Sequence, residues 1–285
     1  MVMSMNISYD INSVLFALGL TLIAGLSTGL GGLISLFAKT TNTRFLSFSL
    51  GLSAGVMIYI SFAELMPEAN EALVAEIGEG LGPWIALIAF FGGMGIIAIV
   101  DKLIPKSKNP HEAFKVEDID ENCITTECQE KRKMGKKRLM RTGILTAVVI
   151  TIHNFPEGIV TFIAALTQPT LAIGVTIAIA LHNIPEGIAV YTPIYYATGS
   201  KKKALLWSFL SGLAEPLGAL LAFLILMPFL SVTLFGILFA AIAGIMVFIS
   251  FDELLPAARE YGEAHLSVYG LVAGMIIMAV TLLLF

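Results

Sequence analysis

Two copies of one short motif hold the residues whose types and spacing could do chemistry. The segment HNFPEGI at 153–159 recurs as HNIPEGI at 182–188. In each copy a histidine, an asparagine and a glutamate stand at positions i, i+1 and i+4, so on a helix the imidazole and the carboxylate share one face, one turn apart. Two such helices facing each other would bring two imidazoles, two carboxamides and two carboxylates together, which is a ligand set for a divalent metal.

The helices that carry these motifs must lie in a membrane. Of 285 residues, 57% are hydrophobic and 13% charged, and the mean hydropathy is +0.87, whereas about a quarter of the residues of a soluble domain are charged. We therefore expect an all-α integral membrane protein with one transmembrane domain over 1–285. No basic residue precedes the first apolar window, so we interpret it as a retained helix and not a signal peptide. Windows of about 20 apolar residues, enough to cross a hydrocarbon core of about 30 Å, predict eight helices near 14–38, 45–66, 82–104, 142–165, 170–196, 204–227, 233–255 and 266–285.

The basic residues predict the orientation of these helices. All 17 Lys and Arg lie in the connections 1–2, 3–4, 5–6 and 7–8, or close to them, and none lies in the other connections or at the termini. By the positive-inside rule the basic loops are cytoplasmic and both termini are outside. We expect a multi-pass protein of the cell (inner or plasma) membrane.

The longest connection, 105–140, mixes acidic and basic residues and contains little that could form a core, so we expect a flexible cytoplasmic loop. Its Cys123 and Cys128 have the spacing C-x4-C, unlike the C-x2-C of most structural zinc sites. We interpret them as reduced thiols. A weak metal-sensing patch of these two cysteines with His111 is the alternative.

The chain also repeats itself outside the motifs. Residues 54–67 and 243–256 match at nine of fourteen positions without a gap, which is hard to attribute to shared apolar composition. These segments belong to the second and seventh helices, which cross the membrane in opposite directions, as do the two motif helices. We therefore predict a 3+2+3 arrangement of inverted repeats, the architecture of transporters with a substrate site near the midplane.

Three glutamates, Glu157, Glu186 and Glu215, are predicted to lie in mid-membrane, where an ionised side chain costs about 2.5–3.5 kcal/mol. No Lys or Arg lies there to neutralise them, so each glutamate must be protonated or have a cation as its partner. Mixed nitrogen and oxygen ligands without a thiolate favour Zn2+, Fe2+, Mn2+ or Co2+ over Ca2+ and Mg2+. The candidate ligands exceed the four of a structural zinc site and leave room for two carboxylate-bridged ions: His153, Asn154, Glu157, His182, Asn183, Glu186 and Glu215.

Three further carboxylates stand near the predicted ends of the second and seventh helices. Glu64 would line an entrance from outside, and Asp252 with Glu253 would line an exit to the cytoplasm. A solvated carboxylate at the membrane interface is the alternative for each of them.

These residues resemble the ZIP (Zrt/Irt-like) family of divalent metal transporters nearly end to end. The doubled motif, Glu215 and the DELLP sequence at 252–256 carry the resemblance. It implies import of metal into the cytoplasm through a two-metal centre, with Met57 where some members place a soft ligand on the second helix. It further implies a zinc-type site of His153, Glu157, His182 and Glu186, beside a site linked to iron of Asn154, Glu157, Asn183, Glu186 and Glu215.

Two departures from the family pattern affect this interpretation. The 3–4 loop has one histidine where many relatives have several, which argues against metal sensing by the loop. Some members open the fifth-helix motif with Gln-Asp or His-Asp, where this chain has His182 and Asn183, and the neutral carboxamide is the weaker ligand.

The sequence therefore predicts a secondary transporter, without a cofactor, that carries Zn2+ and also Fe2+, Mn2+, Co2+ or Cd2+ as substrate. An intramembrane hydrolase that uses zinc-bound water, with a glutamate as base, is the alternative. An enzyme, however, has no need of a site duplicated in inverted orientation. The expected partners are divalent metal ions and the lipid bilayer, with no nucleic acid, and the sequence leaves a homodimer open.

Overall fold

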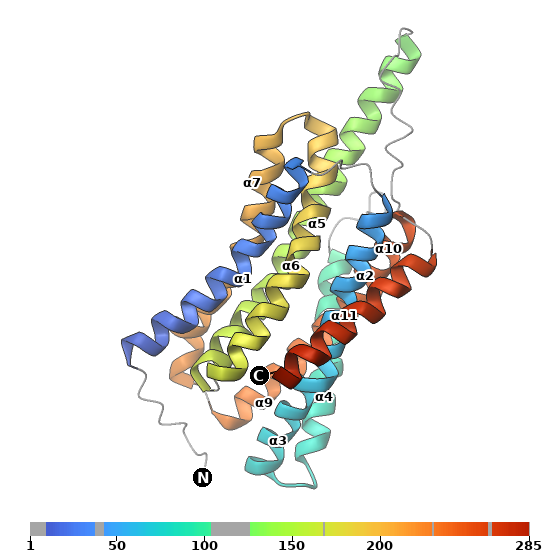
Figure 1. Ribbon diagram of the computed structural model, residues 1–285. Helices are drawn as coiled ribbons and strands as arrows, with labels where there is room; N and C mark the ends of the chain where they lie inside the picture. The colour runs from blue at the N-terminus through green and yellow to red at the C-terminus, as the bar shows by residue number, and fades with distance from the viewer. Residues whose placement is uncertain are drawn as a thin grey trace.

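The computed structural model describes residues 10–37, 43–103, 126–167, 169–229, 231–261 and 264–284, and helices make up almost all of them (Figure 1). Eight helical stretches within these residues are long and apolar enough to cross a membrane. Both the all-α class and the predicted number of spans are thereby confirmed. The stretches are Ile11–Leu36, Ser47–Ile77, Gly82–Val100, Thr146–Thr167, Ala172–Thr198, Lys201–Phe229, Val232–Arg259 and His265–Leu284.

The first five spans contain the helices α1 (Ile11–Phe37), α2 (Thr43–Ile60), α3 (Met66–Ile77), α4 (Gly82–Leu103), α5 (Thr126–Thr167) and α6 (Pro169–Thr198). The sixth is interrupted and comprises α7 (Lys201–Gly212), α8 (Ala214–Leu221), a π-helical turn η3 (Ala222–Leu226) and a 3-10 turn η4 (Met227–Phe229). The last two contain α9 (Val232–Ile249), α10 (Leu255–Tyr261) and α11 (Ala264–Leu284). Serine side chains cap two helix N-termini: Ser200 accepts a hydrogen bond from the Lys203 N–H and Ser231 from the Leu234 N–H.

The sequence predicts that the second and seventh helices end near 66 and 255, directly before a proline. In the structure both helices continue past that proline. A π-helical turn carries the chain through each proline: η1 (Ser61–Leu65) precedes Pro67, and η5 (Ser250–Leu254) precedes Pro256. In each turn the carbonyl oxygen of the serine accepts a hydrogen bond from the backbone N–H five residues later. The wide turn absorbs the loss of the proline N–H without breaking the helix, so the second span runs on to Ile77.

The loop prediction for 105–140 differs from the structure in its second half, because α5 begins at Thr126. Residues 126–140 are rich in Lys, Arg, Glu, Gln and Met, which have high helix propensity and outweigh the charge in this segment. His111 and Cys123 lie outside the described residues, as does the side chain of Cys128.

The helices form two bundles that lie side by side (Figure 1). In the first, which we call the motif bundle, α1 packs along α6, and α5 packs along α6 and α8. In the second, the scaffold bundle, α2 lies along α11, α9 lies along α3 and α4, and α10 packs against α2. The motif bundle therefore contains both copies of the polar motif and also Glu215.

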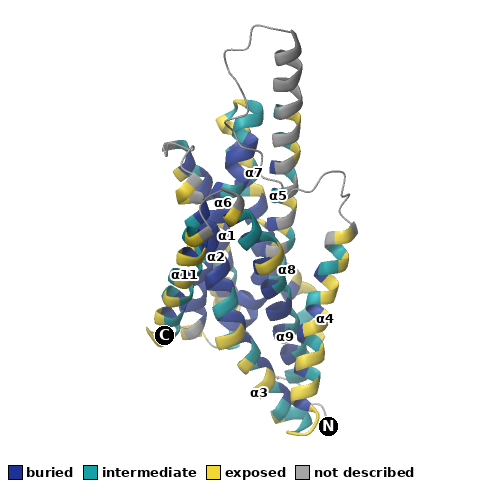
Figure 2. Cartoon of the chain, turned by 90° about the vertical axis from the view of Figure 1, so that its right-hand side faces the viewer, coloured by how far each residue is buried: buried dark blue, intermediate teal, exposed yellow. Residues whose placement is uncertain are grey.

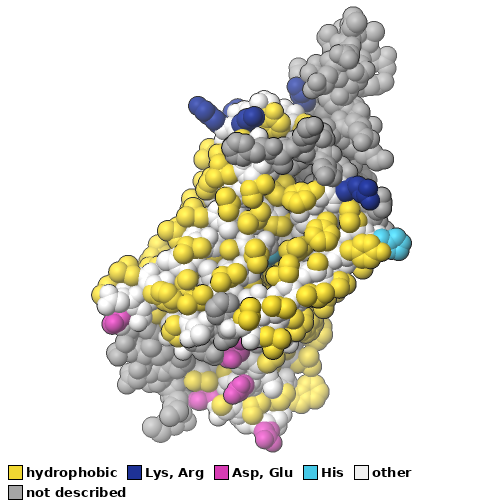
Figure 3. Space-filling view, viewed as in Figure 1, with side chains coloured by type: hydrophobic (Ala, Val, Ile, Leu, Met, Phe, Trp, Pro, Cys, Tyr) yellow, Lys and Arg dark blue, Asp and Glu magenta, His cyan; other side chains and the backbone are white. Residues whose placement is uncertain are grey.

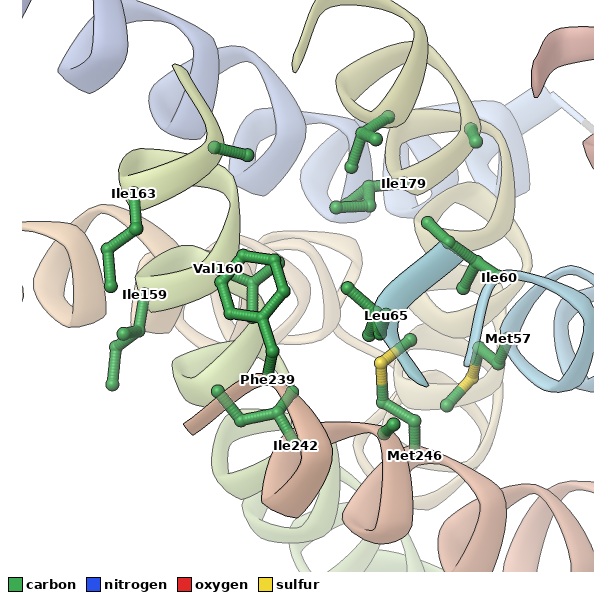
Figure 4. Close-up of a cluster of buried hydrophobic side chains, with 14 of the residues drawn as sticks. Met57, Ile60, Leu65, Ile159, Val160, Ile163, Ile179, Phe239, Ile242 and Met246 are labelled. Carbon is green, nitrogen blue, oxygen red and sulfur yellow. The ribbon is translucent and has the colours of Figure 1, made fainter. Parts of the chain in front are cut away.

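An apolar cluster joins the two bundles (Figure 4). Val160 of α5 and Ile179 of α6 lie on the side of the motif bundle, and Leu65, Phe239 and Met246 lie on the side of the scaffold bundle. All five side chains are buried. The contact between the bundles in this region is therefore made by side chains without hydrogen-bonding groups, apart from the soft thioether of Met246.

Hydrophobic side chains cover much of the face seen in Figure 3, and exposed residues recur along α4 (Figure 2). On α4, for example, Trp84, Ile88 and Phe91 are 63%, 69% and 58% exposed. Large apolar patches on a soluble protein mark a contact surface, and here such side chains lie on helices long enough to span a bilayer. The surface is suited to contact with lipid.

Candidate metal centre

The two motifs meet in the interior of the motif bundle. Since one residue separates α5 from α6 and the two helices pack along each other, they run antiparallel (Figure 1). Nε2 of His182 lies 3.3 Å from Oε1 and 3.4 Å from Oε2 of Glu157. The His182 side chain is 0% exposed and that of Glu157 is 1% exposed. The imidazole of one motif thus contacts the carboxylate of the other.

Glu215 joins the centre from the first turn of α8, directly after the break in the sixth span at Leu213. It accepts a short hydrogen bond from Nδ2 of Asn183, which also donates to the carbonyl oxygen of Ala24 at 3.0 Å. Glu215 and Asn183 are both fully buried. The structure therefore brings the third predicted glutamate to the motif residues of α6.

Asn154 and Glu186 complete the described part of the centre, and both are fully buried. Nδ2 of Asn154 lies 3.4 Å from Oγ1 of Thr28 and 3.4 Å from the carbonyl oxygen of Ser211. Oε1 of Glu186 accepts a hydrogen bond of 3.1 Å from the Ser53 hydroxyl. His153 lies on α5, one residue before Asn154, but its side chain is outside the described residues.

Several acceptor atoms of this centre have no hydrogen-bond partner among the described residues. They include the buried side-chain oxygens Asn154 Oδ1, Asn183 Oδ1 and Glu215 Oε2. Buried acceptors are nearly always satisfied in folded proteins, because leaving one unsatisfied costs free energy. Oxygen atoms of carboxylates and carboxamides are ligands of divalent cations, so the chemistry of these groups fits a metal ion.

The described side chains are not arranged as a closed ligand shell. No three His, Cys, Asp or Glu side chains among them are spaced to hold one metal ion. That set does not include His153, whose side chain is not described, or the carboxamides of Asn154 and Asn183. Glu157 instead contacts His182 directly, and Asn183 contacts Glu215. Binding of a cation would have to open these contacts and turn the acceptor atoms toward the ion.

The remaining predicted residues lie outside this centre. Glu64 is half-buried in η1, within the second span and not at its end, and it lines a small cavity of about 10 Å³ together with Glu68 and apolar residues of α5, α6 and α9. Asp252 and Glu253 lie in η5, where Asp252 is exposed and Glu253 partly exposed. Met57 is buried in the apolar cluster, and its Sδ lies 3.9 Å from the Ser250 hydroxyl.

Sequence reasoning missed Ser53 and Thr28. The Ser53 hydroxyl lies 3.2 Å from the carbonyl oxygen of His182 as well as near Glu186, so α2 contacts the centre through Ser53, one turn before Met57. The sequence feature that could have indicated Ser53 is its place between Gly51 and Gly55, on a stretch of α2 with small residues. A serine among small residues is common in membrane helices for packing alone, which is why it did not stand out.

Replacement of Ser53 by alanine is expected to weaken zinc binding, because it removes a hydrogen bond to a carboxylate that contributes about 1.5–3 kcal/mol. We expect the Kd of purified protein, measured by isothermal titration calorimetry, to rise about tenfold. Met57→Leu, which replaces a buried thioether on the same helix by a similar volume, is the matched control and should bind as the wild type does. A larger loss with Met57→Leu than with Ser53→Ala would reverse the assignment and make Met57 the contact from α2.

Fold and site together define a multi-pass membrane protein built around a buried polar centre, the class that includes metal-ion transporters. The sequence model of the ZIP zinc transporter family matches residues 11–282. The chain belongs to this family.

Curated relatives agree with this membership over nearly the full length. A zinc transporter ZupT of Oceanobacillus iheyensis is 57% identical over 273 residues, which cover 96% of this chain and 99% of the relative. Zinc transporters ZupT of Clostridium perfringens, at 56% identity with 97% and 98% of the two chains covered, and of Streptococcus mutans, at 55% with 93% and 96% covered, are similar as well.

Proposed function

We propose that this protein is a secondary transporter that takes up Zn2+ into the cytoplasm through the centre between α5 and α6. The observation that supports this most directly is the set of buried oxygen acceptors without hydrogen-bond partners within the described residues, on helices that span the membrane. Family membership and the names of the relatives point to the same substrate.

The ligands would form two adjacent positions that share the carboxylates of Glu157 and Glu186. His182 and His153 would complete the first position with nitrogen ligands. Asn154, Asn183 and Glu215 would complete the second with oxygen ligands. Because the first position, with its nitrogen ligands, suits Zn2+, Co2+ and Cd2+, and the second, with oxygen ligands only, suits the harder Mn2+ and Fe2+, we extend the substrates to these ions.

The basic end of the molecule would face the cytoplasm, with both termini outside. In support, Lys and Arg side chains gather at the end where α7 begins, and Asp and Glu side chains at the end where α3 lies (Figure 3). The first turn of α1 and the last turn of α11 lie toward the acidic end (Figure 1). This is the asymmetry that the positive-inside rule uses.

The 3+2+3 inverted repeat would give the transporter its two access states. The second and seventh spans run antiparallel and carry the same π-helical turn: Ser47 donates to the carbonyl of Ala258 at 2.6 Å, and Gly236 packs against Leu73. Alternating access follows when the motif bundle moves relative to the scaffold bundle and so opens the centre to one side at a time. Glu64 would then lie on the outer path, and Asp252 with Glu253 on the inner path.

The hydrolase alternative has lost its support, since the curated relatives described above are zinc transporters. The histidines and glutamates that a hydrolase would use to activate a water molecule can equally bind and release a transported ion. The protein is therefore a transporter and not an enzyme.

Uptake of radiolabelled Zn2+ into proteoliposomes tests the function, and we expect it to fall as the pH decreases from about 7 to about 5 on both sides of the membrane. The ligands must lose their protons before they bind metal, so protons and metal compete for the same atoms. Unlabelled Fe2+, Mn2+, Co2+ and Cd2+ added as competitors rank the substrates. Equal or faster uptake at the lower pH would contradict simple competition and indicate proton coupling, and empty liposomes supply the background.

A further inference from the structure

A segment of the first span resembles a segment of the sixth span in sequence, as the two motifs resemble each other. Residues 25–31 (GLSTGLG) align with 212–218 (GLAEPLG). Gly25 and Gly212 lie against each other, so closely that a methyl group on either would overlap the carbonyl oxygen of the other. This reciprocal contact marks the point where the two spans cross.

The contacts of these spans with the motif helices repeat in pairs. A methyl group at Gly187 of the second motif would overlap the carbonyl oxygen of Thr28, and one at Gly158 of the first motif would overlap the carbonyl oxygen of Glu215. One turn further on, Gly31 and Gly218 make the corresponding contacts with the carbonyl oxygens of the motif residues Ile184 and Phe155. Thr28 therefore occupies, by backbone packing, the position in the first span that Glu215 occupies in the sixth.

The side-chain hydrogen bonds follow the same relation. Asn183 donates to Glu215 and to the backbone carbonyl four residues before Thr28. Asn154 donates to Thr28 and to the backbone carbonyl four residues before Glu215. Thr28 is fully buried, as Glu215 is. Its hydroxyl is therefore in the place where a symmetric protein would carry a second carboxylate.

We infer that Thr28 is a further ligand residue of the oxygen-lined metal position, opposite Glu215, and that its neutral hydroxyl limits the affinity of that position for hard divalent cations such as Mn2+. The inference rests on the proposed function, since it assigns one more residue to the same centre. Thr28 accepts a hydrogen bond from Asn154, and Glu215 accepts one from Asn183. The Oδ1 atoms of these two asparagines have no hydrogen-bond partner within the described part of the centre.

The charge of the centre explains why this position matters. Glu215 places a carboxylate at one of two corresponding positions and Thr28 a hydroxyl at the other, so an ion there is attracted toward Glu215. A carboxylate at both positions would hold a hard cation more tightly, because anionic oxygen is the better ligand for such ions, and would slow its release. A hydroxyl keeps the second ion weakly held.

Three replacements of Thr28 separate its hydroxyl from its volume. Thr28→Val keeps the shape and removes the oxygen, Thr28→Ser keeps the oxygen and removes a methyl group, and Thr28→Asp puts a carboxylate of similar volume in its place. The measurement is Mn2+ binding to purified full-length protein by isothermal titration calorimetry. Zn2+ uptake into proteoliposomes is measured in parallel.

We expect Thr28→Val to weaken binding of the second Mn2+ about tenfold and Thr28→Asp to tighten it about tenfold, with Thr28→Ser within about threefold of the wild type. Zn2+ uptake should slow in Thr28→Asp. Since the valine and aspartate variants make opposite predictions, either one decides if the other fails to fold.

Two results would overturn the inference. One is Mn2+ binding by Thr28→Val and Thr28→Asp with wild-type affinity, and the other is equal loss in Thr28→Val and Thr28→Ser, which would assign Thr28 to packing through its methyl group. Both leave the wild type binding and transporting metal. A wild type that binds neither Mn2+ nor Zn2+ would instead overturn the proposed function.

Discussion

Glu186→Gln is expected to reduce Zn2+ uptake at least about 100-fold. The glutamine has the same shape and can still accept the hydrogen bond that Ser53 donates to Glu186. It lacks the negatively charged carboxylate that would be shared by both metal positions. Loss of a residue that only orients a ligand costs about 10–100-fold in metal affinity, so loss of a shared ligand should cost more. The measurement is initial uptake of radiolabelled Zn2+ into proteoliposomes, with Zn2+ binding to the same preparation by calorimetry.

Glu71→Gln is the matched control. Glu71 is an exposed glutamate on α3, far along the chain from both motifs, and the same change of charge there should leave uptake unaltered. Glu186→Asp, which keeps the charge and shortens the side chain, should retain part of the binding. Full uptake by Glu186→Gln would show that the centre between α5 and α6 is not on the transport path.

That the motif side chains lie together was predictable because it depends on local spacing. An i, i+4 pair of His and Glu on an apolar segment faces one way on any helix, and an unneutralised glutamate in mid-membrane demands a partner. Glu157, Asn183 and Glu186 therefore stood out, and the repeat of the motif indicated that two helices would share the site. The number of spans followed in the same way from apolar length alone.

The contacts from other helices were not predictable by that route. Ser53 and Thr28 are small hydroxyl residues among glycines, and in membrane helices such residues serve packing as often as binding. Only the pairing of helices shows that they contact Glu186 and Asn154. The alignment of 25–31 with 212–218 places Thr28 opposite Glu215 in sequence. This alignment indicates a role for Thr28 only once the structure shows that both segments pack against the motifs.

The second and seventh helices extend beyond their predicted ends near 66 and 255. Pro67 and Pro256 follow π-helical turns that shift the hydrogen bonds by one residue and let each helix continue. Glu64 therefore lies inside its span, beside a cavity, and not at a solvated helix end. Since π-helical turns often occur at functional sites, its position strengthens the case for a role on the outer path.

A cross-link between the two bundles is expected to stop uptake. Glu68 of α3 and Thr167 of α5 belong to different bundles, are both partly exposed and line the same cavity. In a protein with Cys123 and Cys128 replaced by serine, Glu68→Cys with Thr167→Cys can be joined by a short bifunctional methanethiosulfonate. If the apolar contact between the bundles (Figure 4) slides during transport, the cross-link should reduce Zn2+ uptake more than about tenfold, and a reductant should restore it.

The matched control shares one of these cysteines. Glu68→Cys with Phe235→Cys joins α3 to α9 at the same cavity, but both helices belong to the scaffold bundle, so its cross-linking should leave uptake near that of the untreated protein. Each single-cysteine variant treated with the reagent measures the effect of modification alone. Zn2+ binding by calorimetry should survive in the cross-linked protein, because the centre lies within the motif bundle and only its access changes. Normal uptake by the fully cross-linked Glu68–Thr167 pair would show that the two bundles keep their contact at this point, and access to the centre would then have to change by movement within the motif bundle itself.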